Sequence, residues 1–305
     1  MIGLVALIGA SAAIGLAAER RLGDRAEVAA RRVMWLILWV LLPLIAFFQI
    51  AALELSAEVG AAIAYGYVAL VVTAAVAAVT AMRLLHLPRK SAGALVLTAA
   101  FANTGYLGLP FAVALFGIGA LPEAVVYDTL VSGPAFMTIA FAIAAAYGLG
   151  EHVSWRSRAG AFVRRNPPLW AAAAGFAAPA VLAPQWAVDG TQALVFAILP
   201  FGFFAVGVTL AAESRAQRTR LVRWITKPVA VAVALKLVVP PAVVVLLSAA
   251  VIHVPTPYVV QAGMASAINT LVVAHEYELD RGLVAGAIAW STALVSCAGL
   301  IVAAL

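Results

Sequence analysis

Cysteine and charged residues are both scarce in this chain. The single cysteine, Cys297, lies inside an apolar run, which excludes a disulfide framework and a thiol metal site. Only 10% of the 305 residues are charged, 65% are hydrophobic, and the mean hydropathy is +1.08. Because so few polar residues cannot cover a soluble domain, the composition predicts an integral membrane protein. The basic residues fall in short bursts between apolar runs, so we expect the lipid bilayer as a partner and no nucleic acid.

The apolar runs predict an all-α fold with ten membrane-spanning helices. Each run is close to the ~20 residues that cross a ~30 Å hydrocarbon layer. The runs cover residues 2–18, 33–52, 59–84, 91–118, 121–149, 168–183, 190–212, 227–251, 255–276 and 281–304. The first run has no basic residue before it and is followed by Arg20, Arg21 and Arg25, so we expect no cleaved signal peptide.

Basic residues are absent from every second loop between the predicted spans. The odd-numbered loops, together with the span ends that adjoin them, contain every lysine and arginine except Lys236, which lies within the eighth span. Because cationic loops stay in the cytoplasm, this alternation predicts that both termini lie outside.

Residues 101–111 contain groups that a helix in lipid accommodates poorly. They include Asn103, Thr104, Gly105, Gly108 and Pro110. Proline removes a backbone donor, glycine loosens the chain, and a buried amide is costly unless it is paired. We therefore expect the helix to break here, and broken helices at membrane depth line the binding sites of transporters. A proline kink used only for packing is the alternative.

Short matches recur five spans apart. Leu42-Pro43 in span two matches Leu199-Pro200 in span seven, and Asn103-Thr104 in span four matches Asn269-Thr270 in span nine. Because five is odd, the second copy must enter the membrane from the opposite side. We expect two inverted five-helix repeats, residues 1–150 and 151–305, whose broken helices in spans four and nine cross near the middle of the membrane.

Two segments resemble the auxin efflux carrier family, which includes plant PIN-type carriers and bacterial organic-anion permeases. Residues 103–110 are similar to the fourth-span signature of the family, and residues 274–280 are similar to its alanine–basic–Glu-Tyr segment at the end of span nine. The short loop after span five is like that of the bacterial members. The plant members have a proline near Asn269 that this chain lacks, so we expect the second break to be less fully unwound.

This resemblance implies a fold like that of bile-acid symporters and sodium/proton antiporters. Spans three to five and eight to ten would form a mobile transport domain, and spans one, two, six and seven a scaffold that forms a homodimer. The implied function is secondary transport of small organic anions, such as carboxylates or auxin-like acids. The transporter would lie in a bacterial inner membrane and work by elevator-like alternating access. No cofactor is expected, apart from coupling to H⁺ or Na⁺.

The two predicted breaks supply suitable chemistry for a carboxylate. A broken helix exposes N–H groups and the positive end of its dipole, and the side chains of both Asn-Thr pairs can donate hydrogen bonds. No fixed cation is required beside the ligand. The expected substrate site consists of Asn103, Thr104, Gly105, Gly108, Pro110, Asn269 and Thr270.

Two ionisable residues lie at membrane depth, Asp128 in span five and Lys236 in span eight. Charges at such depth are costly and usually serve as relays, counter-ions or coupling sites. We expect coupling or charge balance, with a structural ion pair and snorkelling to an interface as alternatives. Gln49 and Gln261 are further polar residues in spans, which line a path or bond a neighbouring carbonyl.

Catalysis is not expected. Tyr127-Asp128 is similar to one element of intramembrane aspartyl proteases, but that chemistry requires a second intramembrane aspartate, and Asp189 and Asp280 lie at loop ends. The histidines fall in separate places, which does not favour a metal site. Two alternatives to the organic-anion carrier stay open. One is a sodium-coupled bile-acid-type symporter, and the other is a membrane sensor that binds the anion without transporting it.

Overall fold

The computed structural model describes residues 2–52, 56–148, 167–216 and 225–304. These residues fold into helices joined by short turns, as the composition predicts. The loop residues 149–166 and 217–224 contain several of the arginines on which the predicted topology depends, together with the boundary predicted between the repeats. Both loops lie outside the described residues.

In the first half of the chain, α-helices alternate with short π-helical and 3₁₀ turns. The segments are α1 Ile2–Leu22, α2 Asp24–Leu36, η1 Ile37–Leu41, α3 Leu42–Ala51, α4 Ala57–Val79, η2 Thr80–Leu84, α5 Arg89–Ala100, η3 Thr104–Gly108, α6 Leu109–Phe116, η4 Ile118–Ala120, α7 Leu121–Val126, η5 Tyr127–Ser132, α8 Gly133–Ala135, η6 Phe136–Ala140 and α9 Phe141–Tyr147. Gly117, with φ +84°, follows α6 in a backbone conformation that favours glycine. The Ser56 side chain caps α4 by accepting a hydrogen bond from Val59 N.

The second half contains longer helices. The segments are α11 Pro167–Ala177, η7 Ala180–Leu182, α12 Gln185–Ala216, α13 Lys227–Ala250, α14 Thr256–Ala262, α15 Asn269–Glu276 and α16 Arg281–Ala304. The Thr226 hydroxyl caps α13, and Pro257 lies in the first turn of α14, where its missing N–H costs no hydrogen bond.

Five described helices are long and apolar enough to cross a membrane. They are Asp24–Ala51, Ala57–Leu84, Ile118–Tyr147, Lys227–Ala250 and Arg281–Gly299. Thr104–Phe116 and Pro200–Thr209 are apolar but shorter. Interruptions divide residues 89–116 and 256–276 into shorter pieces, so neither range forms one continuous spanning helix. Helical segments cover each of the ten predicted ranges, but ten membrane crossings and their inverted repeat stay predictions.

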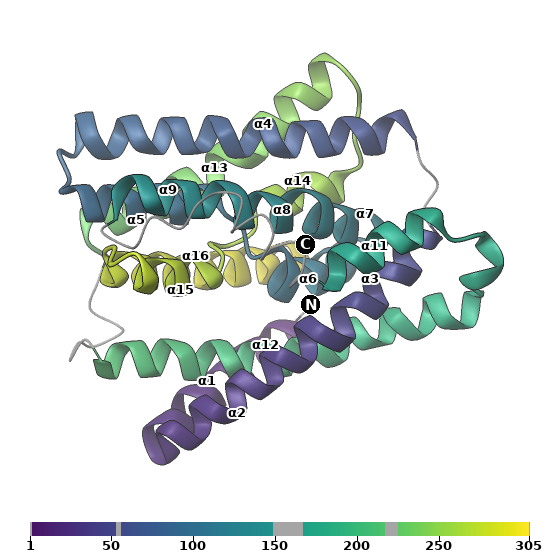
Figure 1. Ribbon diagram of the computed structural model, residues 1–305, viewed down its shortest axis with the longest axis horizontal. Coiled ribbons are helices and arrows are strands. Elements are labelled where there is room, and N and C mark those ends of the chain that lie inside the picture. The colour runs from purple at the N-terminus through teal and green to yellow at the C-terminus, as the bar shows by residue number, and fades with distance from the viewer. Residues whose placement is uncertain (1, 53–55, 149–166, 217–224, 305) are drawn as a thin grey trace.

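Helices α1 and α12 pack side by side, and α4 lies on the opposite side of the molecule (Figure 1). A Cβ atom at Gly15 would collide with the carbonyl oxygen of Phe204 and lie 3.0 Å from Val208 N. One at Gly207 would collide with the carbonyl oxygen of Ala12 and lie 3.0 Å from Leu16 N. The two backbones therefore touch, and only residues without a side chain fit at these two positions.

A charged cluster fastens the end of α12 to the turn between α1 and α2. Arg215 Nε lies 3.1 Å from the carboxylate of Glu19, and Arg215 Nη2 lies 2.8 Å from that of Glu27 and 3.5 Å from that of Asp24. The Glu19 side chain is only 2% exposed, so water cannot stabilise its charge and the Arg215 guanidinium must do so. Asp24 and Glu27 are more exposed and need Arg215 less.

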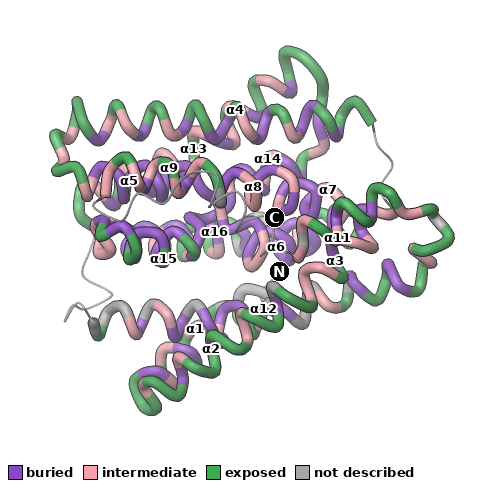
Figure 2. Tube along the Cα trace, in the orientation of Figure 1, coloured by how far each residue is buried: buried purple, intermediate pink, exposed green. Residues whose placement is uncertain are grey.

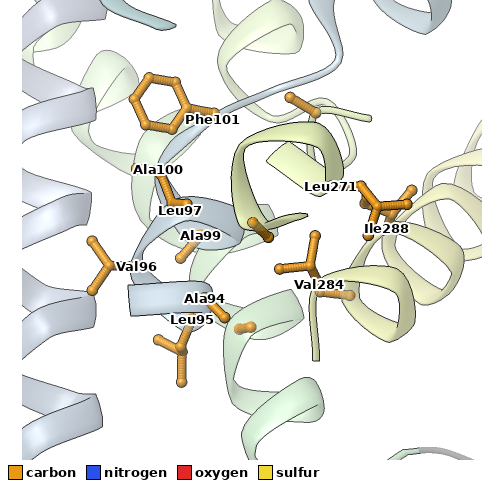
Figure 3. Packing of buried hydrophobic residues seen from close by; sticks show 14 of the residues in the cluster. Ala94, Leu95, Val96, Leu97, Ala99, Ala100, Phe101, Leu271, Val284 and Ile288 are labelled. Carbon is orange, nitrogen blue, oxygen red and sulfur yellow. The ribbon is translucent and has the colours of Figure 1, made fainter. Parts of the chain in front are cut away.

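The buried core lies between these outer helices (Figure 2). Residues 92–100 of α5 are all buried, which is typical of a helix surrounded by protein. The end of α5 packs near Leu271 of α15 and Val284 and Ile288 of α16 (Figure 3). The exposed positions of α4 include Val68, Val71, Val76 and Val79, an apolar surface suited to lipid.

Candidate functional site

The candidate site is built around an interruption between α5 and α6. Helix α5 ends at Ala100, Phe101 is extended (φ −102°, ψ 131°), and the chain becomes helical again at Thr104 as the π-helical turn η3. Pro110, the second residue of α6, is buried. Its ring blocks the hydrogen bond that a regular helix would make four residues earlier, which explains the irregular turn before it.

A second interruption separates α14 from α15 and pairs with the first. Asn103 N donates to Ala265 O at 2.7 Å, and Ala267 N donates to Phe101 O at 2.9 Å. These two hydrogen bonds surround an antiparallel bridge between Ala102 and Ser266. Each non-helical segment thereby satisfies backbone groups of the other, which a buried segment without helical hydrogen bonds requires.

The second interruption differs from its prediction in place and extent. Helix α14 ends at Ala262 and α15 begins at Asn269, so the non-helical residues precede the Asn269-Thr270 pair and outnumber those of the first interruption. The helix is interrupted here without a proline, because side chains bond the backbone groups that lack helical hydrogen bonds. Ser266 N donates to the Ser291 hydroxyl, and the Ser266 hydroxyl donates to Thr98 O.

The four predicted donor side chains have different environments. Asn103 is 4% exposed, and its Nδ2 has no hydrogen-bond partner, so this donor is free to bind a ligand. The Thr104 hydroxyl already donates to Asp128 Oδ1, and the Thr270 hydroxyl donates to Ala267 O. Asn269 is exposed. Of these four residues, Asn103 alone combines burial with an unused donor.

The glycines of the first interruption leave room for side chains from other helices. A Cβ atom at Gly105 would lie 3.3 Å from both carboxylate oxygens of Asp128. A Cβ atom at Gly108 would collide with the side-chain amide of Gln261. In this structure both glycines accommodate protein side chains, and neither faces the pocket described next.

Lys236 lines a small pocket beside the first interruption. Its Nζ donates to Ala262 O, the last residue of α14, at 2.8 Å, and the residue is 1% exposed. The pocket has a volume of about 20 Å³, which is room for about one water molecule. It is lined by Leu70, Ala100, Phe101, Ala102, Tyr127, Val131, Ser132, Lys236, Pro240 and Ala262.

Asp128 and Lys236 do not form the structural pair considered from the sequence. Neither takes part in an ion pair among the described residues, and each is bonded to a different helix. Lys236 lies beside the first interruption, where it lines the same pocket as Phe101.

Comparison with known proteins identifies the class of this chain. Residues 163–302 match the family model described as membrane transport protein. The matched residues all lie in the second half of the chain. The match confirms the resemblance to auxin efflux carriers predicted from the sequence, and it contains Lys236, Gln261 and the second interruption. A comparison with curated proteins finds no significant match. The family and the apolar helices together indicate a transporter that lies in a membrane.

Sequence reasoning gave little weight to Gln261. It is fully buried, and its Nε2 donates to Thr104 O at 3.4 Å and to Ala124 O at 3.2 Å. It thus links α14 to the turn after the first interruption and to α7. An amide within an apolar segment, close in sequence to a break, is the signal that indicates such a role.

Proposed function

We propose that this protein is a secondary transporter of small organic anions, such as carboxylates, and that the anion binds in the pocket beside Lys236. The observation that carries the proposal is the buried ammonium group of Lys236. It is 1% exposed, and no ion pair among the described residues neutralises it. A cation at membrane depth without a counter-charge is costly, and an anionic substrate would remove that cost.

The donors around the pocket suit a carboxylate. An ammonium group has three donors, and Lys236 uses one of them on Ala262 O. Asn103 does not line the pocket, but it follows the lining residues 100–102 in the sequence and has an unused Nδ2 donor, which we propose reaches the anion. Leu70, Val131 and Pro240 supply apolar walls. A short apolar body with one carboxylate matches this combination of donors and apolar walls. The pocket is smaller than a ligand site of ~300 Å³, so the proposal requires it to widen when the anion enters.

The paired interruptions support a mechanism of alternating access. We propose ten spans in two inverted repeats, with the interrupted helices crossing near the middle of the membrane. Spans three to five and eight to ten would move against a dimeric scaffold of spans one, two, six and seven, and both termini would face the outside of a bacterial inner membrane. The close α1–α12 contact supports grouping those two helices in the scaffold.

Flux measurements in proteoliposomes test the proposal. Purified protein should accelerate uptake of some radiolabelled mono- or dicarboxylates but not of the corresponding neutral amides, and protein-free liposomes provide the background. Gradients of Na⁺ and of pH, applied separately, distinguish uniport from symport. Binding without flux would support the sensor instead.

Asn103→Ala provides the residue-level test. We expect this variant to fold but to lose flux, because the free Nδ2 donor is removed. The matched control is Gln185→Ala, because the Gln185 amide is exposed and bonds Asp189 within α12, far from the pocket in sequence. A fully active Asn103→Ala variant would show that Asn103 has only an architectural role.

A further inference from the structure

The turn η3 contacts two oxygen-bearing side chains from other helices. Asp128 of η5 lies against Gly105, and Gln261 of α14 lies against Gly108. Thr104 contacts both, because its hydroxyl donates to Asp128 Oδ1 and its carbonyl oxygen accepts from Gln261 Nε2. The absence of side chains at the two glycines is what brings these groups to the same turn.

The carboxylate of Asp128 lacks a counter-charge. Among the described residues it accepts a side-chain hydrogen bond from Thr104, and no lysine, arginine or histidine forms an ion pair with it. One hydrogen bond does not offset the cost of a carboxylate at membrane depth. Either a proton or a bound cation must therefore neutralise this group when the transporter is in the bilayer.

The side-chain oxygen of Gln261 is a second unsatisfied acceptor. Both partners of Gln261 Nε2 are carbonyl oxygens, which fixes the orientation of the amide because only its NH₂ group can donate to them. Its Oε1 atom is then directed away from them, is fully buried and has no hydrogen-bond partner. A buried acceptor in a native protein normally has a donor, a water or an ion beside it.

We infer that the Asp128 carboxylate and the Gln261 Oε1 atom bind a monovalent cation, Na⁺, beside Gly105 and Gly108. Small hard cations prefer oxygen ligands, and a single carboxylate balances a single positive charge. A proton on Asp128 is the competing way to neutralise this group, and the measurements below distinguish it from Na⁺. Na⁺ satisfies both the carboxylate and the amide oxygen. The site stands on this geometry alone, and only its role as a coupling site rests on the proposed function.

Equilibrium binding of ²²Na⁺ and the thermal unfolding midpoint, measured in detergent at constant ionic strength with choline replacing Na⁺, test the site. Na⁺ should raise the midpoint of the wild-type protein with its concentration, as expected for a ligand that binds only the folded state. Asp128→Asn and Gln261→Ala should each weaken Na⁺ affinity about tenfold or more. The matched control is Gln49→Ala. Gln49 is also fully buried with an unpartnered Oε1, but it bonds Val188 and Thr191 of α12, so its loss should leave Na⁺ affinity unchanged.

Gly108→Ala tests the geometry without removing a ligand. Its Cβ atom would displace the Gln261 amide, so this variant should lose Na⁺ affinity as Gln261→Ala does. The double variant Gly108→Ala/Gln261→Ala should then bind Na⁺ no more weakly than Gln261→Ala alone, because the side chain that Gly108→Ala displaces is already absent.

Three outcomes would overturn the inference. Equal midpoints in Na⁺ and choline for the wild-type protein would show that no site exists. Unchanged affinity in Asp128→Asn or Gln261→Ala would place the ion elsewhere. A midpoint that responds to pH through Asp128 but not to Na⁺ would assign a proton instead. Carboxylate flux that needs no Na⁺ gradient would leave the transport function standing while removing the coupling role.

Discussion

Replacing Lys236 by methionine is the most direct perturbation of the substrate pocket. Methionine keeps most of the length and apolar volume of the side chain but removes the charge and the donors. The ammonium group is fully buried and has donors left after its bond to Ala262 O, so a bound carboxylate would form charge-assisted hydrogen bonds with it. Such bonds contribute about 1.5–3 kcal/mol. At about 1.4 kcal/mol per factor of ten, Lys236→Met should weaken apparent substrate affinity between roughly tenfold and a hundredfold.

The assay is the concentration dependence of carboxylate uptake in proteoliposomes. Lys236→Arg, which keeps the charge, should retain more affinity than Lys236→Met, and this difference separates loss of charge from loss of packing. Both variants must elute as single species in size-exclusion chromatography. A methionine variant that transports the acid with wild-type apparent affinity would refute the argument that this cation binds the anion.

Two further predictions concern stability. Gly15→Ala should destabilise the protein by about 1–3 kcal/mol because its Cβ atom would collide with the backbone of Phe204. The control is Gly9→Ala, which should be neutral or slightly stabilising because no atom lies within 4 Å of the new Cβ. The thermal unfolding midpoints of the two variants provide the comparison. Arg215→Gln should destabilise by about 3–5 kcal/mol because it leaves a buried carboxylate without its cation. The control is Arg31→Gln, which removes the exposed ion pair between Arg31 and Glu27 and should cost only about 0–1 kcal/mol. Equal denaturant midpoints for Arg215→Gln and Arg31→Gln would contradict a stabilising role for the Arg215 cluster.

The sequence predicts the helical class and the first interruption because each depends on local chemistry. Apolar runs of spanning length must form helices in lipid, where every backbone group needs an internal partner. Pro110 removes one of those groups wherever it lies, so the irregular turn before it follows from the residue itself. The same reasoning found Asn103, since an amide at a helix break is either paired or available to a ligand.

The sequence does not predict features that depend on contacts between distant segments. The extent of the second interruption depends on Ser291 and Thr98, which lie on other helices and bond Ser266. The same holds for Gly108, whose role follows from the placement of Gln261, more than a hundred residues away. Thr104 and Thr270 were predicted as donors to substrate because nothing local shows that their hydroxyls bond protein groups.

The backbone exchange between residues 101–103 and 265–267 limits how this protein can change shape. Separating these two segments would expose amide and carbonyl groups inside the bilayer, where no water replaces the lost partners. Any rearrangement that carries a solute from one side of the membrane to the other must therefore keep these two segments hydrogen-bonded to each other, and the relative movement must occur between other helices. Lys236 bonds the last residue of α14, just before the second segment, so it would move together with these two segments. An anion bound to Lys236, as proposed above, would then keep its counter-charge throughout the crossing.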